Sequence, residues 1–137
     1  MPTIPGFRQT TARDKTPMPT FQFENTQVTY RDEGGKAADV TLLLIPGLGG
    51  TLAFWNPVFD RLAKTCRLLS FDHPGMGNSE VPRQPSTVDR LAELTTTLLD
   101  HAGVEKAIYV GHSMGGAISQ TAAYQYSNRV RALVLSS

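Results

Sequence analysis

The stretch that decides the fold is AIYVGHSMGGAIS, residues 107–119. An apolar, β-branched run ends at Gly111, and small residues follow Gly116. This order predicts a buried strand, a sharp turn and a helix that lies close to the sheet. Ser113 would stand at the apex of that turn in a strained backbone conformation.

Glycines two residues before and two residues after Ser113 match the G-x-S-x-G pattern of a nucleophile elbow. Side chains at those two positions would collide with neighbouring strands, so we expect Gly111 and Gly115 to be structural. Gly116 would let the helix approach the sheet. The helix N-terminus favours negative charge at the same point. Ser113 is therefore the candidate nucleophile, and the alternative is an ordinary strand–turn–helix with a surface serine.

Strands alternate with helices from residue 40 onward, which predicts an α/β fold with a mostly parallel sheet and helices on both faces. Ser86 and Asp89 predict a capping box for the helix that precedes Gly103. Alternating residues over 21–34 predict half-buried edge strands. We expect buried parallel strands at 40–45, 67–72, 106–112 and 130–136, and helices at 52–63, 88–102 and 114–127.

Two further glycine-rich loops follow predicted strands, LLLIPGLGGTLAFW (42–55) and FDHPGMGNSEVP (71–82). Acyl transfer needs two backbone donors for an oxyanion, and the N–H groups of Met114 and Leu48 are the candidates. The alternative for the first loop is an ordinary strand-to-helix turn. Asp72 is expected to hold the second loop by accepting backbone hydrogen bonds.

Together the three motifs resemble the α/β-hydrolase family over about residues 21–137, and the enol-lactonase-type branch in particular. The resemblance implies a serine hydrolase that forms an acyl-enzyme at Ser113 from an ester, lactone or similar carbonyl substrate. It implies no metal and no organic cofactor. The chain has Pro46-Gly47 where the family often has His-Gly.

The family's chain order is Ser, then Asp or Glu, then His. Residues 114–137 contain no Asp, Glu or His. Of the upstream histidines, His112 is expected to pack beneath the elbow and His101 to lie on the surface. His73, near the active-site edge, is the remaining and weaker candidate for a base. We therefore expect the acid and the histidine beyond residue 137.

The run VRALVLSS at 130–137 has the pattern of a strand buried on both faces. A chain that stops there would expose an apolar edge. This pattern and the missing triad partners together predict that the chain is the N-terminal part of the hydrolase domain, truncated after about the sixth strand.

Composition narrows the class of protein. The 137 residues are 40 % apolar and 18 % charged with a net charge of +1, so the sequence suggests neither nucleic acid nor a membrane as partner. Residues 1–20 are rich in proline and threonine and predict a flexible arm. The single cysteine, Cys66, is expected to be a buried structural thiol in a reducing, cytoplasmic setting.

Three functional hypotheses remain, and within the enzyme class a carbon–carbon bond hydrolase or a peroxidase-like relative is a further alternative. The first is a serine hydrolase that acts on a small-molecule substrate. The second is a small-molecule receptor of the same fold without turnover. The third is an inactive fragment, which is the state we expect for the 137 residues alone.

Overall fold

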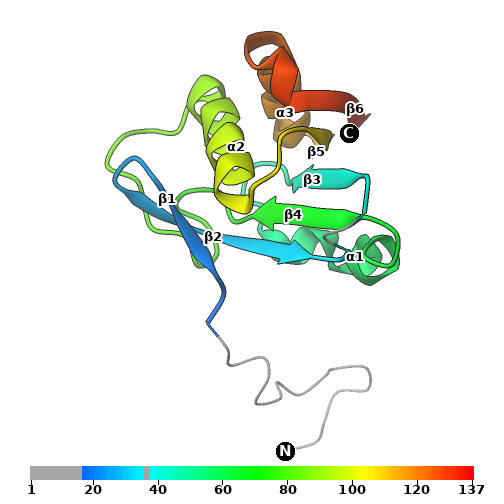
Figure 1. Ribbon diagram of the computed structural model, residues 1–137. Helices are drawn as coiled ribbons and strands as arrows, with labels where there is room; N and C mark the ends of the chain where they lie inside the picture. The colour runs from blue at the N-terminus through cyan, green and yellow to red at the C-terminus, as the bar shows by residue number, and fades with distance from the viewer. Residues whose placement is uncertain (1–16, 36–37) are drawn as a thin grey trace, which may run out of the picture.

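The computed structural model describes residues 17–35 and 38–137. Most of the predicted arm, residues 1–16, lies outside the described residues, and a strand already begins at Thr20. One sheet has the strand order β1-β2-β4-β3-β5-β6 (Figure 1). Its strands are β1 (Thr20–Phe23), β2 (Thr26–Glu33), β3 (Thr41–Ile45), β4 (Arg67–Phe71), β5 (Ala107–His112) and β6 (Val130–Ser136).

The sheet is parallel from β4 through β3 and β5 to β6, and antiparallel at β1 and β2. This confirms the predicted α/β architecture with a mostly parallel sheet. One detail is wrong: the pattern over 27–34 predicted an edge strand, whereas β2 lies between β1 and β4. Alternation reports that one face of a strand is exposed, and it is silent about the strand's position in the sheet.

Both faces of the sheet are covered by helices, which are α1 (Asn56–Leu62), α2 (Val88–Ala102) and α3 (Met114–Gln125) (Figure 1). Leu43 and Leu69 belong to the core on the side of α2 and α3, whereas Leu44 and Leu68 pack with Phe59 on the side of α1. Successive strand residues therefore serve two separate cores, which explains why the central strands are apolar without interruption.

The predicted helix over 52–63 is divided into a 3-10 turn, η2 (Leu52–Trp55), and α1. Pro57 falls in the first turn of α1, where its missing N–H has no intrahelical acceptor to lose. The predicted capping box at Ser86 is wrong, because Thr87 is the N-cap and its hydroxyl accepts from the Arg90 N–H at 3.1 Å. Gly103 ends α2 as predicted, with φ +70°.

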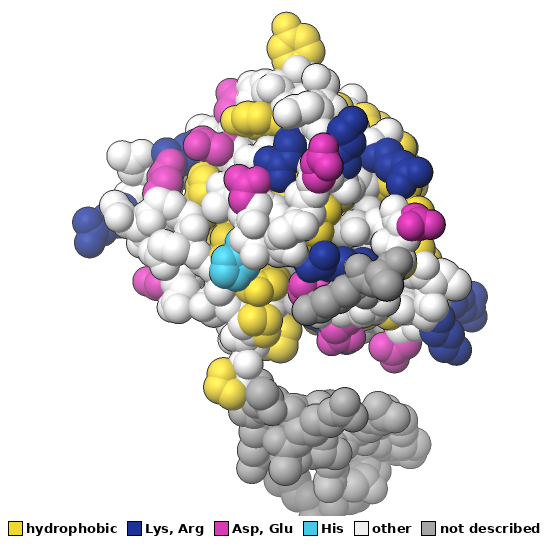
Figure 2. All heavy atoms as spheres, in the orientation of Figure 1, with side chains coloured by type: hydrophobic (Ala, Val, Ile, Leu, Met, Phe, Trp, Pro, Cys, Tyr) yellow, Lys and Arg dark blue, Asp and Glu magenta, His cyan; other side chains and the backbone are white. Residues whose placement is uncertain are grey.

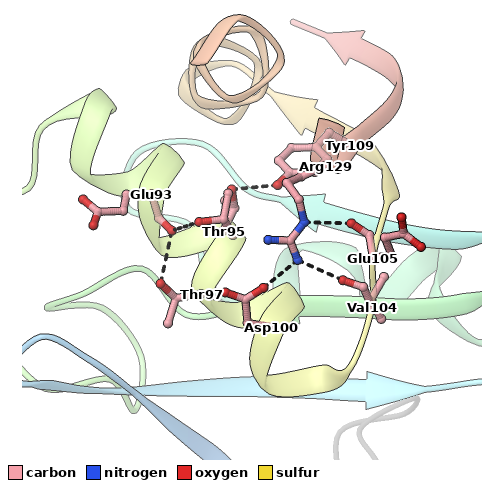
Figure 3. A network of polar contacts seen from close by, with 9 residues as sticks. Glu93, Thr95, Thr97, Asp100, Val104, Glu105, Tyr109 and Arg129 are labelled. Atoms are coloured by element: carbon pink, nitrogen blue, oxygen red, sulfur yellow. Dashed lines mark hydrogen bonds and ion pairs between the residues drawn. The ribbon is translucent and has the colours of Figure 1, made fainter. Parts of the chain in front are cut away.

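A polar network holds the connection between α2 and β5 (Figure 3). Arg129, in the 3-10 turn η3 (Ser127–Arg129), donates from Nε to the Glu105 carbonyl at 2.8 Å and pairs with Asp100 at 2.7 Å. Nearby, the buried Tyr109 hydroxyl lies 2.9 Å from Thr95 Oγ1, and burial raises the pKa of Tyr109 to about 12. The network fixes the amino end of β5, one strand length away from Ser113.

Among the described residues, the outermost strand β6 pairs with β5 alone; Val130 is half-buried and the other side chains of β6 are exposed. Leu133, Val134 and Leu135 are 37, 51 and 48 % exposed, respectively. The predicted strand at 130–136 is present, but its predicted burial is wrong, because no described residue packs over these side chains deeply enough to bury them. Cys66, predicted to be buried, is only half-buried beside Phe59.

Basic and acidic side chains are interleaved on the face shown in Figure 2, in keeping with the net charge of +1. Within residues 17–35 and 38–137, we find no helix with the length and hydrophobicity needed to cross a membrane.

Candidate active site

Ser113 stands between β5 and α3 with φ +54° and ψ −117°. Its N–H donates to the Ser136 carbonyl of β6 at 2.9 Å, and its own carbonyl accepts from the Gly116 N–H at 2.8 Å. A positive φ is unfavourable for a residue with a Cβ atom, so these contacts must hold the turn in place. The serine side chain is exposed, as a nucleophile that meets substrate must be.

The glycines around Ser113 differ in how strictly they are required. A Cβ atom at Gly111 would lie closer than 3.0 Å to the Gly115 backbone, and one at Gly115 closer than 3.0 Å to the Ile45 carbonyl. At Gly116 the nearest atoms would be 3.7 Å away, which is ordinary contact. Close packing of α3 against the ends of β3 and β5 therefore excludes side chains at the first two positions. The expectation that Gly116 is needed for this approach is not supported by the geometry.

The loop after β3 lies directly beside the elbow. A Cβ atom at Gly47 would be 3.3 Å from Ser113 Cβ, so the loop backbone approaches the serine closely. Leu48 and Met114 both line one cavity of about 80 Å³. Met114 is the first residue of α3, so its N–H has no acceptor within the helix. The two residues proposed as oxyanion donors are thus brought together.

Asp72 connects the two glycine-rich loops. One carboxylate oxygen accepts from the Leu52 N–H at 2.8 Å and the other from the Asn78 N–H at 3.0 Å. The predicted role of Asp72 as a backbone acceptor is confirmed, and it extends to the loop after β3. A Cβ atom at Gly77 would collide with this carboxylate.

His73 is 4 % exposed, and its Nε2 lies 2.8 Å from the Pro46 carbonyl. A carbonyl only accepts, so Nε2 carries the proton and Nδ1 is the bare nitrogen. Nδ1 is buried without a partner among the described residues. Burial lowers the pKa of His73, against the opposing influences of the Pro46 hydrogen bond and the Asp72 charge. His73 is thus a neutral support of the loop after β3, and no pattern in the sequence predicted its contact with Pro46.

The other histidines are also engaged elsewhere. The His112 ring stacks on Phe54 at 4.9 Å between centroids, and its Nδ1 lies 3.0 Å from Ser136 Oγ. It therefore packs beside the elbow and is half-buried. His101 is exposed at the end of α2, as expected, and its ring lies 5.3 Å from that of Tyr30. The contacts of His112 with Phe54 and Ser136 join segments that are distant in the sequence, and no sequence pattern predicts them.

The described residues contain no group of three or more His, Cys, Asp or Glu side chains arranged to hold a metal ion. The candidate site brings together a strained serine, a closely approaching glycine-rich loop and a small adjoining cavity. This arrangement can present a nucleophile and an oxyanion site to one carbonyl group.

Comparison with known proteins points to one family. The chain is 33 % identical over 116 residues to a poly(3-hydroxyalkanoate) depolymerase of Ectopseudomonas oleovorans, covering 85 % of this chain and 41 % of that protein. It is 36 % identical over 98 residues to the putative carbamate hydrolase RutD of Azorhizobium caulinodans, covering 72 and 37 %, respectively. The chain thus spans about two fifths of the length of these curated relatives.

The fold comparison agrees. The enol-lactonase from Burkholderia xenovorans LB400 superposes with a TM-score of 0.79 at 29 % identity, over 84 % of this chain and 45 % of that structure. The family model of the alpha/beta hydrolase fold matches residues 40–137, which contain the elbow and both glycine-rich loops. The chain belongs to the alpha/beta hydrolase fold family.

Proposed function

We propose that the protein is a serine hydrolase that cleaves an ester, lactone or similar carbonyl compound. Ser113 Oγ attacks the carbonyl carbon and gives up its proton to a base, while the Leu48 and Met114 N–H groups stabilise the oxyanion. Collapse of the tetrahedral intermediate expels the alcohol, which takes that proton. Water then releases the acid and regenerates Ser113.

The observation that carries the proposal is the elbow itself. Ser113 has a positive φ of +54° and is exposed. It adjoins the loop after β3, where a Cβ atom placed on Gly47 would lie 3.3 Å from the Cβ atom of Ser113. Such strain is retained where the surrounding structure holds it for a purpose. The relatives named as a depolymerase, a carbamate hydrolase and an enol-lactonase support hydrolysis at a carbonyl centre.

The base is assigned to a histidine outside residues 1–137. Within the chain, His73 is buried and donates to Pro46, and His112 stacks on Phe54 beside Ser136. Residues 114–137 contain no His, Asp or Glu. The share of the curated relatives' length that the chain covers leaves room for both missing partners.

A fluorophosphonate probe tests the proposal on the protein that contains residues 1–137. Labelling should be lost in Ser113→Ala and kept in Ser127→Ala, because Ser127 is an exposed serine at the far end of α3. Equal labelling of the Ser113→Ala protein would exclude Ser113 as the nucleophile. Steady-state hydrolysis of p-nitrophenyl acetate distinguishes an enzyme from a receptor of the same fold, which would bind without turnover.

A further inference from the structure

The cavity beside the candidate oxyanion site has walls from four separate segments. They are the loops after β3 and β4, the segment before α2 together with its first turn, and the start of α3. Its volume is about 80 Å³. The side chains that the argument uses are Leu48, His73, Met76, Leu91 and Met114.

We propose that this cavity receives the acyl group of the substrate and restricts it to a short, uncharged chain. The inference rests on the proposed function, because the Leu48 and Met114 N–H groups place the carbonyl at the cavity's edge. The leaving alcohol must depart before water attacks, whereas the acyl group stays bonded to Ser113 until it is hydrolysed. A pocket walled on several sides suits the part that stays.

The cavity's size sets the chain length. An apolar cavity of about 150 Å³ holds one benzene, which has six carbon atoms. In proportion, the cavity of about 80 Å³ beside Leu48 and Met114 holds about three carbons. With the carbonyl carbon at the cavity's edge, the remaining carbons of acetyl, propanoyl and butanoyl groups fit, and a longer chain extends beyond the cavity.

The residues that line the cavity determine the charge of the acyl chain that it accepts. Among the described residues, those that line it include no Asp, Glu, Lys or Arg. His73 is neutral because burial lowers its pKa, and behind it Asp72 already carries a negative charge at 3 % exposure. An acyl chain with a terminal carboxylate would lose its hydration and meet no cationic side chain.

A series of p-nitrophenyl esters measures both properties on the protein that contains residues 1–137. We expect kcat/KM to be highest between acetate and butanoate and to fall at least about tenfold by octanoate, since one methylene that does not fit costs about that much. The half-ester of succinic acid should react at least about tenfold more slowly than butanoate.

Met76 offers a direct test of the wall. Its side chain is 37 % exposed, so Met76→Ala opens the cavity without removing a core residue. The ratio of octanoate to butanoate kcat/KM should rise about tenfold in this variant. Met18→Ala is the matched control, because Met18 is 39 % exposed and lies outside the cavity, before β1.

The outcomes separate the two proposals. An ester series that stays level or rises to octanoate, with Ser113-dependent turnover intact, overturns the short-chain pocket and leaves the hydrolase standing. So does an equal change of the ratio in Met18→Ala and Met76→Ala. Faster reaction of the succinate half-ester overturns the assignment of charge. Absence of turnover for every ester overturns the proposed function and this inference with it.

Discussion

Asp72→Asn perturbs the one side chain that joins both glycine-rich loops of the site. Asp72 is 3 % exposed, and its two carboxylate oxygens each accept one backbone N–H, from Leu52 at 2.8 Å and from Asn78 at 3.0 Å. Asparagine has the same shape and keeps one acceptor oxygen. Its amide nitrogen is a donor, so one of the two backbone N–H groups then faces another donor.

The magnitude follows from these two bonds. A hydrogen bond to a charged acceptor contributes about 1.5–3 kcal/mol, and a neutral one about 1 kcal/mol. Asp72→Asn removes one bond and converts the other from charged to neutral. We therefore expect the free energy of unfolding to fall by about 2–5 kcal/mol, which is a large share of a domain's total stability.

Urea unfolding followed by tryptophan fluorescence measures this change. Trp55 is the single tryptophan, it is buried, and it immediately follows the loop that Asp72 anchors. Asp60→Asn is the matched control, because Asp60 lies on the exposed side of α1, and it should change stability by less than about 0.5 kcal/mol. A loss below about 0.5 kcal/mol for Asp72→Asn as well would refute the view that this carboxylate anchors the loops.

Two further predictions concern the neighbours of this anchor. Gly115→Ala places a Cβ atom against the Ile45 carbonyl and should lower the free energy of unfolding by about 1–3 kcal/mol or more. Gly116→Ala is the control, because a Cβ atom has space there, and it should be neutral or stabilising. Equal effects of the two substitutions in urea unfolding would contradict the steric argument. Because burial lowers the pKa of His73, the unfolded chain binds its proton first as the pH falls below about 6.5, and stability should decrease there by at most about 1.4 kcal/mol per pH unit. Unfolding measured between about pH 7.5 and pH 5 should show that loss of stability in the native protein and in His101→Gln, the control at an exposed histidine. His73→Gln should lose much less stability over the same range. If stability depends on pH as steeply in His73→Gln as in the native protein, His73 is not the cause.

The elbow was predictable because its steric constraints appear at fixed positions around the serine. The reversal of strand into helix leaves no room for a Cβ atom at Gly111, which would meet the Gly115 backbone, and the approach of β3 leaves none at Gly115, which would meet the Ile45 carbonyl. Both constraints show in the sequence as glycine spacing. The same holds for the parallel strands, whose uninterrupted apolar runs reflect burial on two faces, as at Leu43 and Leu44.

The remaining features depend on contacts between distant segments. The Asp72 bond to Leu52 spans 20 residues, and the His73 bond to Pro46 spans 27. No periodicity or turn signal reports such pairs. The cap of α2 was misplaced by one residue for a different reason, because serine and threonine are both good caps and only the extended backbone of Thr87 decides between them.

The contacts around the loop after β3 bear on its proposed role as an oxyanion site, because they fix the position of a glycine-rich segment. Glycines make a backbone adaptable, which opposes the fixed donor geometry that catalysis needs. Here the first carbonyl of the loop, that of Pro46, is held by His73, and its last N–H, that of Leu52, is held by Asp72. Asp72 and His73 are consecutive residues directly after β4, so the segment that follows one neighbouring strand fixes both ends of the loop. The glycines leave the loop without side chains that would block a substrate carbonyl in the proposed site. The two hydrogen bonds from the residues after β4 restrict the conformation that the glycines alone would leave free.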